Sequence, residues 1–185
     1  DYEFDHLMRE LIDLETAFPE YYDSNSPSLR VGGEVVETFN KIVHKRMMLS
    51  LSNAFNDEEL ELFDKRVKEI LQTNEEIEYM CELKIDGLSV SLLYEKGKLV
   101  RAATRGDGTK GEDITHNARV LPSIPQRIDY YDTFVVDGEV ICDKTTFEQF
   151  KDEYANCRNF AAGSIRLLDS NECAKRGLTF VAWDV

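Results

Sequence analysis

The sequence predicts an α+β fold with an antiparallel sheet at its core. Two β-rich runs within residues 88–106 flank Lys96-Gly97, a two-residue turn signal that is typical of a β-hairpin. Further β-rich runs stand at 132–141 and 178–185. The helical patterns between these runs do not alternate regularly with them, as they would around a parallel sheet. We therefore expect an antiparallel sheet with helices as separate elements around it.

Composition limits the classes of protein to consider. The chain has 185 residues, of which 42% are hydrophobic, enough for one packed domain with a small subdomain. It contains no apolar run long enough to cross a membrane, and its opening residues are charged and amphipathic rather than typical of a signal peptide. We expect no membrane partner and a location in the cytoplasm or at the nucleoid.

Charge and cysteine usage add two further limits. The formal net charge of −14 opposes tight binding to nucleic acid by this chain alone, so we expect contact with DNA to depend on other domains. The cysteines are widely spaced and form no C-x-x-C pair, which does not favour a zinc site and suits a reducing compartment. They are Cys81, Cys142, Cys157 and Cys173.

The N-terminal part of the chain predicts a helix followed by a linker. Apolar residues keep helical spacing over residues 4–18, and Pro19 ends the pattern. Residues 21–35 are rich in Ser, Gly and Asn, which is typical of a linker or a long ordered loop. We place the domain boundary here, with a helical unit at 1–28 and the core at 29–185.

A second helix is expected after Asn56, which is suited to be an N-cap because Glu59 completes a capping box. Its apolar stripe predicts packing into the core and consists of Leu60, Phe63, Val67, Ile70 and Leu71. Shorter helices are expected at 112–121 and 144–154, with a turn of helix within 158–170.

The strongest chemical signal lies in residues 77–86, where apolar and polar residues alternate as in a strand. Glu82, Lys84 and Asp86 would then project from one face, and Gly87 would end the strand. A lysine held between two carboxylates suits a reaction in which it attacks a substrate. The same pattern is also typical of a solvated strand face, and spacing alone leaves both interpretations open.

Residues 106–111 spell G-x-G-x-x-G, and Asp129 follows at roughly the distance seen in dinucleotide-binding folds. Two observations oppose that interpretation. A hairpin precedes the glycines instead of a strand–helix–strand unit, and the loop carries charged residues where pyrophosphate would need close approach. We expect instead a tight loop with positive φ angles beside Arg105.

The polar residues of the chain suit one chemical task when they are taken together. Phosphoryl transfer to a lysine requires a positioned amine, cations around the phosphate and a flat surface for the base. A lysine is ordinarily protonated at neutral pH and cannot attack, so cations must outweigh carboxylates beside it. The residues that could meet these needs are Glu82, Lys84, Asp86, Gly87, Arg105, Glu139, Arg158, Arg166 and Trp183.

On these residues the sequence resembles the adenylation domain of the NAD-dependent DNA ligases. The strongest block is residues 81–120, which contain the K-x-D-G motif. Further similar stretches are SPSLRVGG, MLSLSNAF, VDGEV, RNFAAGSIRLLD and LTFVAWDV. The resemblance implies an antiparallel-sheet, ATP-grasp-like nucleotidyltransferase core, NAD and Mg²⁺ as cofactors, and nicked double-stranded DNA as a partner through domains outside this chain.

The resemblance also implies a role for each residue. Lys84 would attack the adenylyl phosphate of NAD⁺, form a covalent bond to AMP and release nicotinamide mononucleotide, while Asp86 would orient Lys84 or contact the ribose. The residues implied in nucleotide binding are Glu82, Ser50, Leu51, Arg105, Glu139 and Trp183, and Glu139 is also implied in holding the metal through water. Arg158 and Arg166 are implied in contacts with phosphate or DNA, and Asp1, Phe4 and Asp5 in contacts with the nicotinamide half.

The chain departs from the family's pattern at several positions. Phe4 and Trp183 stand where the family usually has Tyr, Cys157 stands for Pro, and Asp137 stands for Arg. The chain ends at Val185, before the family's E-x-D-G-V-V-x-K strand. Two alternatives therefore stay open: a non-catalytic nucleotide-binding fragment or degenerate relative, and a K-x-D-G transferase that uses ATP or GTP.

Overall fold

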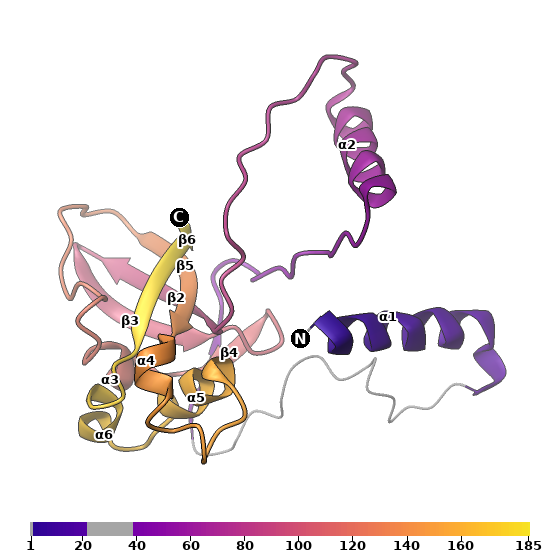
Figure 1. Ribbon diagram of the computed structural model, residues 1–185. Coiled ribbons are helices and arrows are strands. Elements are labelled where there is room, and N and C mark those ends of the chain that lie inside the picture. The colour runs from indigo at the N-terminus through magenta and orange to yellow at the C-terminus, as the bar shows by residue number, and fades with distance from the viewer. Residues whose placement is uncertain (1, 22–38) are drawn as a thin grey trace.

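A computed structural model describes residues 2–21 and 39–185. Its elements in chain order are α1 (Tyr2–Ala17), η1 (Pro19–Tyr21), β1 (Lys41–Val43), α2 (Asp57–Leu71), β2 (Leu88–Glu95), β3 (Lys98–Thr104), β4 (Lys110–Glu112), α3 (Thr115–Ala118), β5 (Phe134–Ile141), α4 (Lys144–Phe147), α5 (Cys157–Ser164), α6 (Ser170–Ala174) and β6 (Thr179–Asp184). In Figure 1 the short helices gather beside the main sheet, whereas α1 and α2 lie apart from it.

The main sheet has the strand order β3-β2-β5-β6, and each neighbouring pair is antiparallel. This confirms the expected α+β class with antiparallel pairing. The β2–β3 hairpin turns at Lys96 and Gly97, whose φ angles are 50° and 71°. Two consecutive positive φ angles are typical of the tight hairpin turn that matches the twist of the strands, so the predicted hairpin is confirmed.

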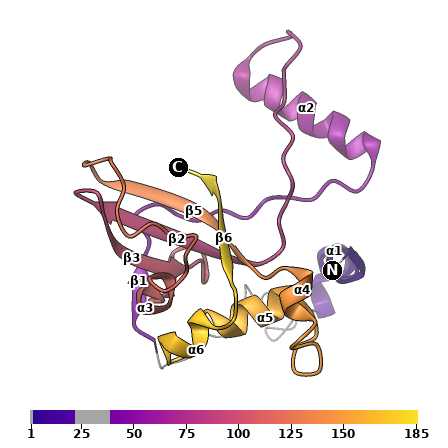
Figure 2. The same cartoon turned by 60° about the vertical axis from the view of Figure 1, so that its left-hand side comes forward.

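One face of the sheet forms the hydrophobic core. Val90, Leu92 and Tyr94 alternate along β2 and are buried against the helical layer. At the centre of that layer Phe160 is fully buried, with the Phe150 ring stacked on it at 4.6 Å. Figure 2 shows α5 and α6 on this side of the sheet. The intervening residues of each strand point to the other face, which is therefore the face left for polar groups.

The expected strand at 77–86 is wrong, because regular strand structure begins only at Leu88. Within the described ranges no strand pairs with this segment, so no ladder of hydrogen bonds fixes its backbone. Its apolar residues are not buried on one side: Met80 is 88% exposed and Leu83 is 91% exposed, while Ile77 and Ile85 are partly buried.

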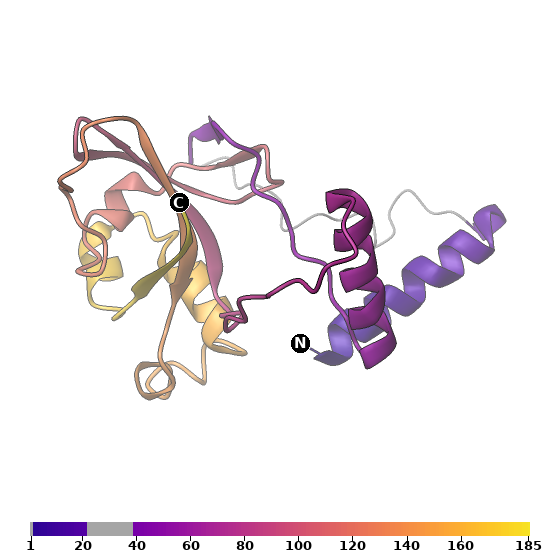
Figure 3. The same cartoon turned by 90° about the horizontal axis from the view of Figure 1, so that it is seen from above.

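The second helix forms as expected but does not pack into the core. Its capping box is confirmed, since the backbone N–H of Glu59 donates to Asn56 Oδ1 at 2.9 Å. None of its residues is buried, so the prediction that its apolar stripe packs into the core is wrong. The helix stands away from the sheet and meets α1, where Arg9 pairs with Glu59 at 2.8 Å (Figure 3).

The glycine-rich loop joins β3 to β4 and confirms the expected positive φ angles, 56° at Gly106 and 89° at Gly108. No described strand pair is parallel, and a strand–helix–strand dinucleotide-binding unit requires parallel strands. This excludes a dinucleotide-binding unit at the G-x-G-x-x-G loop. Sequence reasoning missed the small β1–β4 sheet. The loop lies against the segment after β1, because the N–H of Met48 donates to the carbonyl of Gly108 at 2.9 Å.

The remaining expectations differ in detail. The first helix and the strands at 132–141 and 178–185 are confirmed as α1, β5 and β6. The helix expected at 144–154 covers only the four residues of α4, whereas the expected turn within 158–170 is the eight-residue α5. Most of the predicted linker at 21–35 lies outside the described residues. Among the described helices, none has both the length and the apolar character needed to span a membrane.

Candidate nucleotide site

The candidate site centres on Glu139, on the sheet face opposite the helices. In the β2–β5 register Ser89 lies directly opposite Glu139, and its hydroxyl donates to Glu139 Oε2 at 2.9 Å. Burial raises the pKa of the Glu139 carboxyl. The Ser89 hydrogen bond, the charges of Lys84 and Arg105, and a hydrogen-bonding interaction with the Trp183 side chain oppose that rise. This carboxylate therefore lies in the sheet between β2 and β6, and the charges of two connecting segments act on it.

The nucleophile candidate approaches this carboxylate from the segment before β2. The side chain of Lys84 is exposed, and its charge acts on Glu139. Two residues later, Asp86 Oδ1 lies 3.7 Å from Nε of Arg158, in the first turn of α5. Both partners are more than half exposed, so this pair contributes little to stability. Its consequence is positional, because it brings a guanidinium beside the K-x-D-G motif.

A second cation is held at the end of β3. Arg105 Nη1 donates to Ser50 Oγ at 3.4 Å, and His44 Nε2 lies 3.1 Å from the Arg105 carbonyl oxygen. These contacts join the glycine-rich loop to the segment after β1. Leu51 follows Ser50 and is 77% exposed, so its side chain is available to a ligand rather than to the core.

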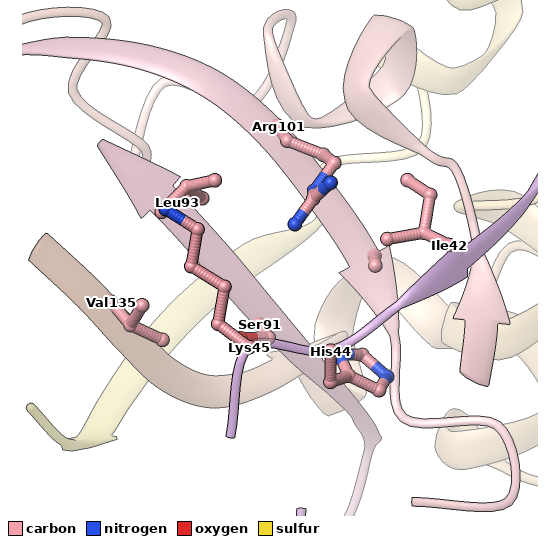
Figure 4. Close-up of a pocket in the computed structure, with 8 residues that line it drawn as sticks. Ile42, His44, Lys45, Ser91, Leu93, Arg101 and Val135 are labelled. Carbon is pink, nitrogen blue, oxygen red and sulfur yellow. The ribbon is translucent and has the colours of Figure 1, made fainter. Parts of the chain in front are cut away.

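A small hollow lies beneath the same segment (Figure 4). It is lined by Ile42, His44, Lys45, Ser91, Leu93, Arg101, Ala103 and Val135. The Lys45 side chain extends over the sheet toward Leu93, and Arg101 enters from β3. The cavity volume is about 20 Å³, which is room for about one water molecule. It is therefore too small to hold a nucleotide, and the candidate site remains the open face around Glu139.

Arg166 takes a different place from the other candidate residues. Its Nε lies 2.6 Å from Glu112 Oε2, and the Glu112 side chain is only 3% exposed. This ion pair ties the segment after α5 to β4.

The other candidate residues add little to the geometry. Glu82 is exposed on the segment before β2. Asp1 and the side chains of Phe4 and Asp5 lie outside the described part of the chain, so the proposed nicotinamide side is not described.

Two residues of the site were missed by sequence reasoning. Ser89 could have been found from alternation along the second strand, since it shares the parity that faces away from the core. Arg46 binds Asp137 and Asp184 next to Trp183, and no spacing in the sequence signals that contact, because the partners are 91 and 138 positions away.

Comparison with known proteins identifies the families that this chain matches. Residues 36–185 match the family model described as NAD-dependent DNA ligase adenylation domain. Residues 1–32 match the one described as DNA ligase-like, N-terminal NAD⁺-binding domain. A curated DNA ligase of Shouchella clausii is 48% identical over 193 residues, with 100% of this chain and 28% of the relative covered.

Two further curated relatives named DNA ligase give the same result. That of Halalkalibacterium halodurans is 50% identical over 186 residues, and that of Thermosipho africanus is 46% identical over 186 residues. Each alignment covers 96% of this chain and 28% of the relative, so the chain spans about 28% of the length of these proteins. The adenylation-domain model matches residues 36–185, which are most of this chain. The chain therefore belongs to the family of NAD-dependent DNA ligase adenylation domains.

Proposed function

We propose that this chain performs the first step of nick sealing, in which AMP is transferred from NAD⁺ to Lys84. The observation that carries the proposal is the position of Glu139, which accepts a hydrogen bond from Ser89 at 2.9 Å and lies opposite Val181 of β6, two residues before Trp183. The charges of Lys84 and Arg105 and the Trp183 side chain act on the same carboxylate. These groups are a nucleophile, a cation, a base platform and a hydrogen-bond acceptor, which are the components that such a transfer requires. Membership of the adenylation-domain family supports the same assignment.

The chemical step uses the lysine amine directly. Nζ of Lys84 attacks the phosphorus of the adenylyl group, and a P–N bond forms as the P–O bond to nicotinamide mononucleotide breaks. The mononucleotide leaves with the bridging oxygen and its electron pair, and the amine releases its proton to solvent. Arg158, held beside Asp86 at 3.7 Å, supplies positive charge near the transferring phosphate.

The nucleoside is held by the residues around the sheet face. Trp183 is 47% exposed and offers an aromatic surface on which adenine can stack. Glu139 accepts a hydrogen bond from a ribose hydroxyl, and Glu82 meets the edge of the base. Arg105, placed by Ser50 and His44, contacts the ribose side of the nucleotide.

Mg²⁺ fits this site in the manner usual for nucleotide enzymes. The described residues contain no cluster of three or more His, Cys, Asp or Glu that could hold a metal. Mg²⁺ usually keeps several waters and takes one or two carboxylates together with substrate phosphates. Glu139 would hold it through water, where it would neutralise phosphate charge.

The overall organisation follows the same proposal. We assign residues 29–185 to an ATP-grasp-like nucleotidyltransferase core and residues 1–28 to a helical unit on the nicotinamide side. The two family matches meet between residues 32 and 36, close to this boundary. Because the net charge is −14, nicked double-stranded DNA is engaged mainly through domains outside this chain, with Arg158 contributing phosphate contact.

Intact-mass measurement tests the proposal. The protein is incubated with NAD⁺, ATP or GTP in the presence of Mg²⁺, and the gain of one AMP is expected from NAD⁺ alone. Lys84→Ala should abolish the adduct, whereas the matched variant Lys175→Ala, at an exposed lysine of α6's C-terminal cap, should retain it. The adduct should also disappear in EDTA.

The other outcomes separate the alternatives. An adduct from ATP or GTP would indicate a K-x-D-G transferase of different specificity. Nucleotide binding without an adduct from any nucleotide would indicate a non-catalytic binding module. Quantitative adduct formation in EDTA would refute the requirement for a metal.

A further inference from the structure

Arg46 bridges two carboxylates at the end of the sheet that carries the candidate base platform. Its Nη2 lies 3.0 Å from Asp137 Oδ2 and 2.8 Å from Asp184 Oδ2. Asp137 and Asp184 are directly opposite each other in the β5–β6 register. Like charges placed opposite on neighbouring strands repel, so this end of the strand pair depends on a cation between them.

The Asp137 carboxylate makes that dependence strong. Its side chain is only 4% exposed, and within the described ranges its Oδ1 has no hydrogen-bond partner. Arg46 Nη2 is the charged group that meets its other oxygen. Removing one partner of a buried ion pair leaves a charge without compensation, and the local structure must then rearrange to reach water or another cation.

The same place in the sheet contains a bulge that determines where Trp183 points. The β5–β6 register shifts between Asp137 and Gly138, because Gly138 pairs with Ala182 whereas Asp137 pairs with Asp184. Trp183 is therefore the extra residue on β6. A bulge changes the direction of the side chain that it carries, and here that side chain interacts with Glu139.

We propose that Arg46 is a positioning residue for nucleotide binding, which holds the bulge so that the Trp183 ring faces the base. The inference rests on the proposed function of Trp183 as the adenine platform. Arg46 binds Asp184 on β6, next to the bulge, and Asp137 on the opposite strand β5, so it holds the two strands together at this point. The segment that carries it continues to Ser50, which contacts Arg105, so one segment organises both sides of the nucleotide face.

The protein offers a direct spectroscopic readout, because it contains one tryptophan. The variants are Arg46→Met, Arg46→Lys and the double variant Arg46→Met/Asp137→Asn, which removes the buried charge together with its partner. Lys45→Met is the matched control, since its pair with Glu95 is nearly half exposed on both sides and lies on the same segment. Each variant is studied by tryptophan emission without ligand, by NAD⁺ titration and by single-turnover adenylylation.

Arg46→Met should shift the Trp183 emission to longer wavelength in the ligand-free protein and weaken NAD⁺ binding by about tenfold, the scale of one base–aromatic stack. The adenylylation rate at saturating NAD⁺ should change less than twofold, since the nucleophile is untouched. Arg46→Lys should recover most of the affinity. Lys45→Met should match the wild type in emission, affinity and rate.

The double variant is included in case Arg46→Met alone fails to fold. It should show the same red-shifted emission and weak NAD⁺ binding as Arg46→Met, with nearly the stability of the wild type. Wild-type emission and affinity in a folded Arg46→Met or double variant would overturn the inference. A loss of rate at saturating NAD⁺ with unchanged affinity would overturn it as well. Failure of the wild type to bind NAD⁺ would instead refute the proposed function, while the emission of the ligand-free variants would still report whether Arg46 positions Trp183.

Discussion

Replacing Arg166 with methionine tests whether this residue stabilises the fold or serves a phosphate. The Arg166 side chain is 35% exposed and its Nε lies 2.6 Å from the carboxylate of Glu112, whose side chain is 3% exposed. Methionine keeps much of the side-chain volume but removes the charge. The variant therefore removes this guanidinium from the buried Glu112 carboxylate.

The expected cost follows from the burial of the pair. Two unit charges about 4 Å apart attract by about 4 kcal/mol at an effective dielectric constant of about 20. Breaking a buried pair typically costs about 3–5 kcal/mol. Because about one third of Arg166 reaches solvent, screening reduces this value. We expect the free energy of unfolding of Arg166→Met to fall by about 2–3 kcal/mol.

Urea unfolding measures this change. With an m-value of about 2–3 kcal/mol/M for a chain of this size, the midpoint should fall by about 1 M. Lys175→Met is the control, because it removes only an exposed pair with Glu172 and should leave the midpoint nearly unchanged. The double variant Arg166→Met/Glu112→Gln should recover most of the loss, since a neutral amide is less costly to bury than a carboxylate.

A different result would refute the reasoning. If Arg166→Met unfolds at the same urea concentration as Lys175→Met, the ion pair does not hold β4 to the segment after α5. If the same folded variant then loses AMP transfer or contact with nicked DNA, Arg166 serves phosphate instead, as the family resemblance implies. If the double variant is no more stable than Arg166→Met, the cost does not come from the buried carboxylate.

Three further predictions address the sheet and its thiols. Burial raises the pKa of the Glu139 carboxyl above its usual range, so ionising this group lowers stability as the pH rises through the raised pKa. Glu139→Gln should therefore be more stable than the wild type at pH 7 and should lose that advantage at about pH 4 in denaturation experiments, and an equal difference at both pH values would contradict this. Gly138→Ala should lower the free energy of unfolding by about 1–3 kcal/mol, because the added Cβ would lie 2.3 Å from Cζ of Phe180. An unchanged melting temperature would show instead that the strands adjust freely. Burial raises the pKa of Cys173 to about 11, so little of its thiol is the reactive thiolate at pH 8. Iodoacetamide at that pH should therefore modify the exposed Cys81 first, as followed by peptide mass mapping. Equal rates at the two thiols would contradict the burial of Cys173.

Local chemistry in the sequence was enough to predict the features that depend on neighbouring residues. The hairpin at Lys96-Gly97 and the capping box at Asn56 form as expected, because each depends on a few adjacent residues. The sequence by itself also determined the family, through a long block of motif around Lys84. It also predicted Glu139 and Trp183 as site residues, and in the structure the Trp183 side chain acts on the pKa of Glu139.

Only the tertiary structure decided what depends on a partner distant in the sequence. Alternation predicts a strand at 77–86, but a strand also needs a neighbour to pair with, and the described chain provides none there. Apolar spacing correctly predicts the helix α2 but does not show what covers its apolar side. Arg46 and Arg166 are ordinary surface cations in the sequence, and folding places both beside buried carboxylates. Pattern therefore specified local conformation, whereas burial and charge pairing depended on which segments folding brought together.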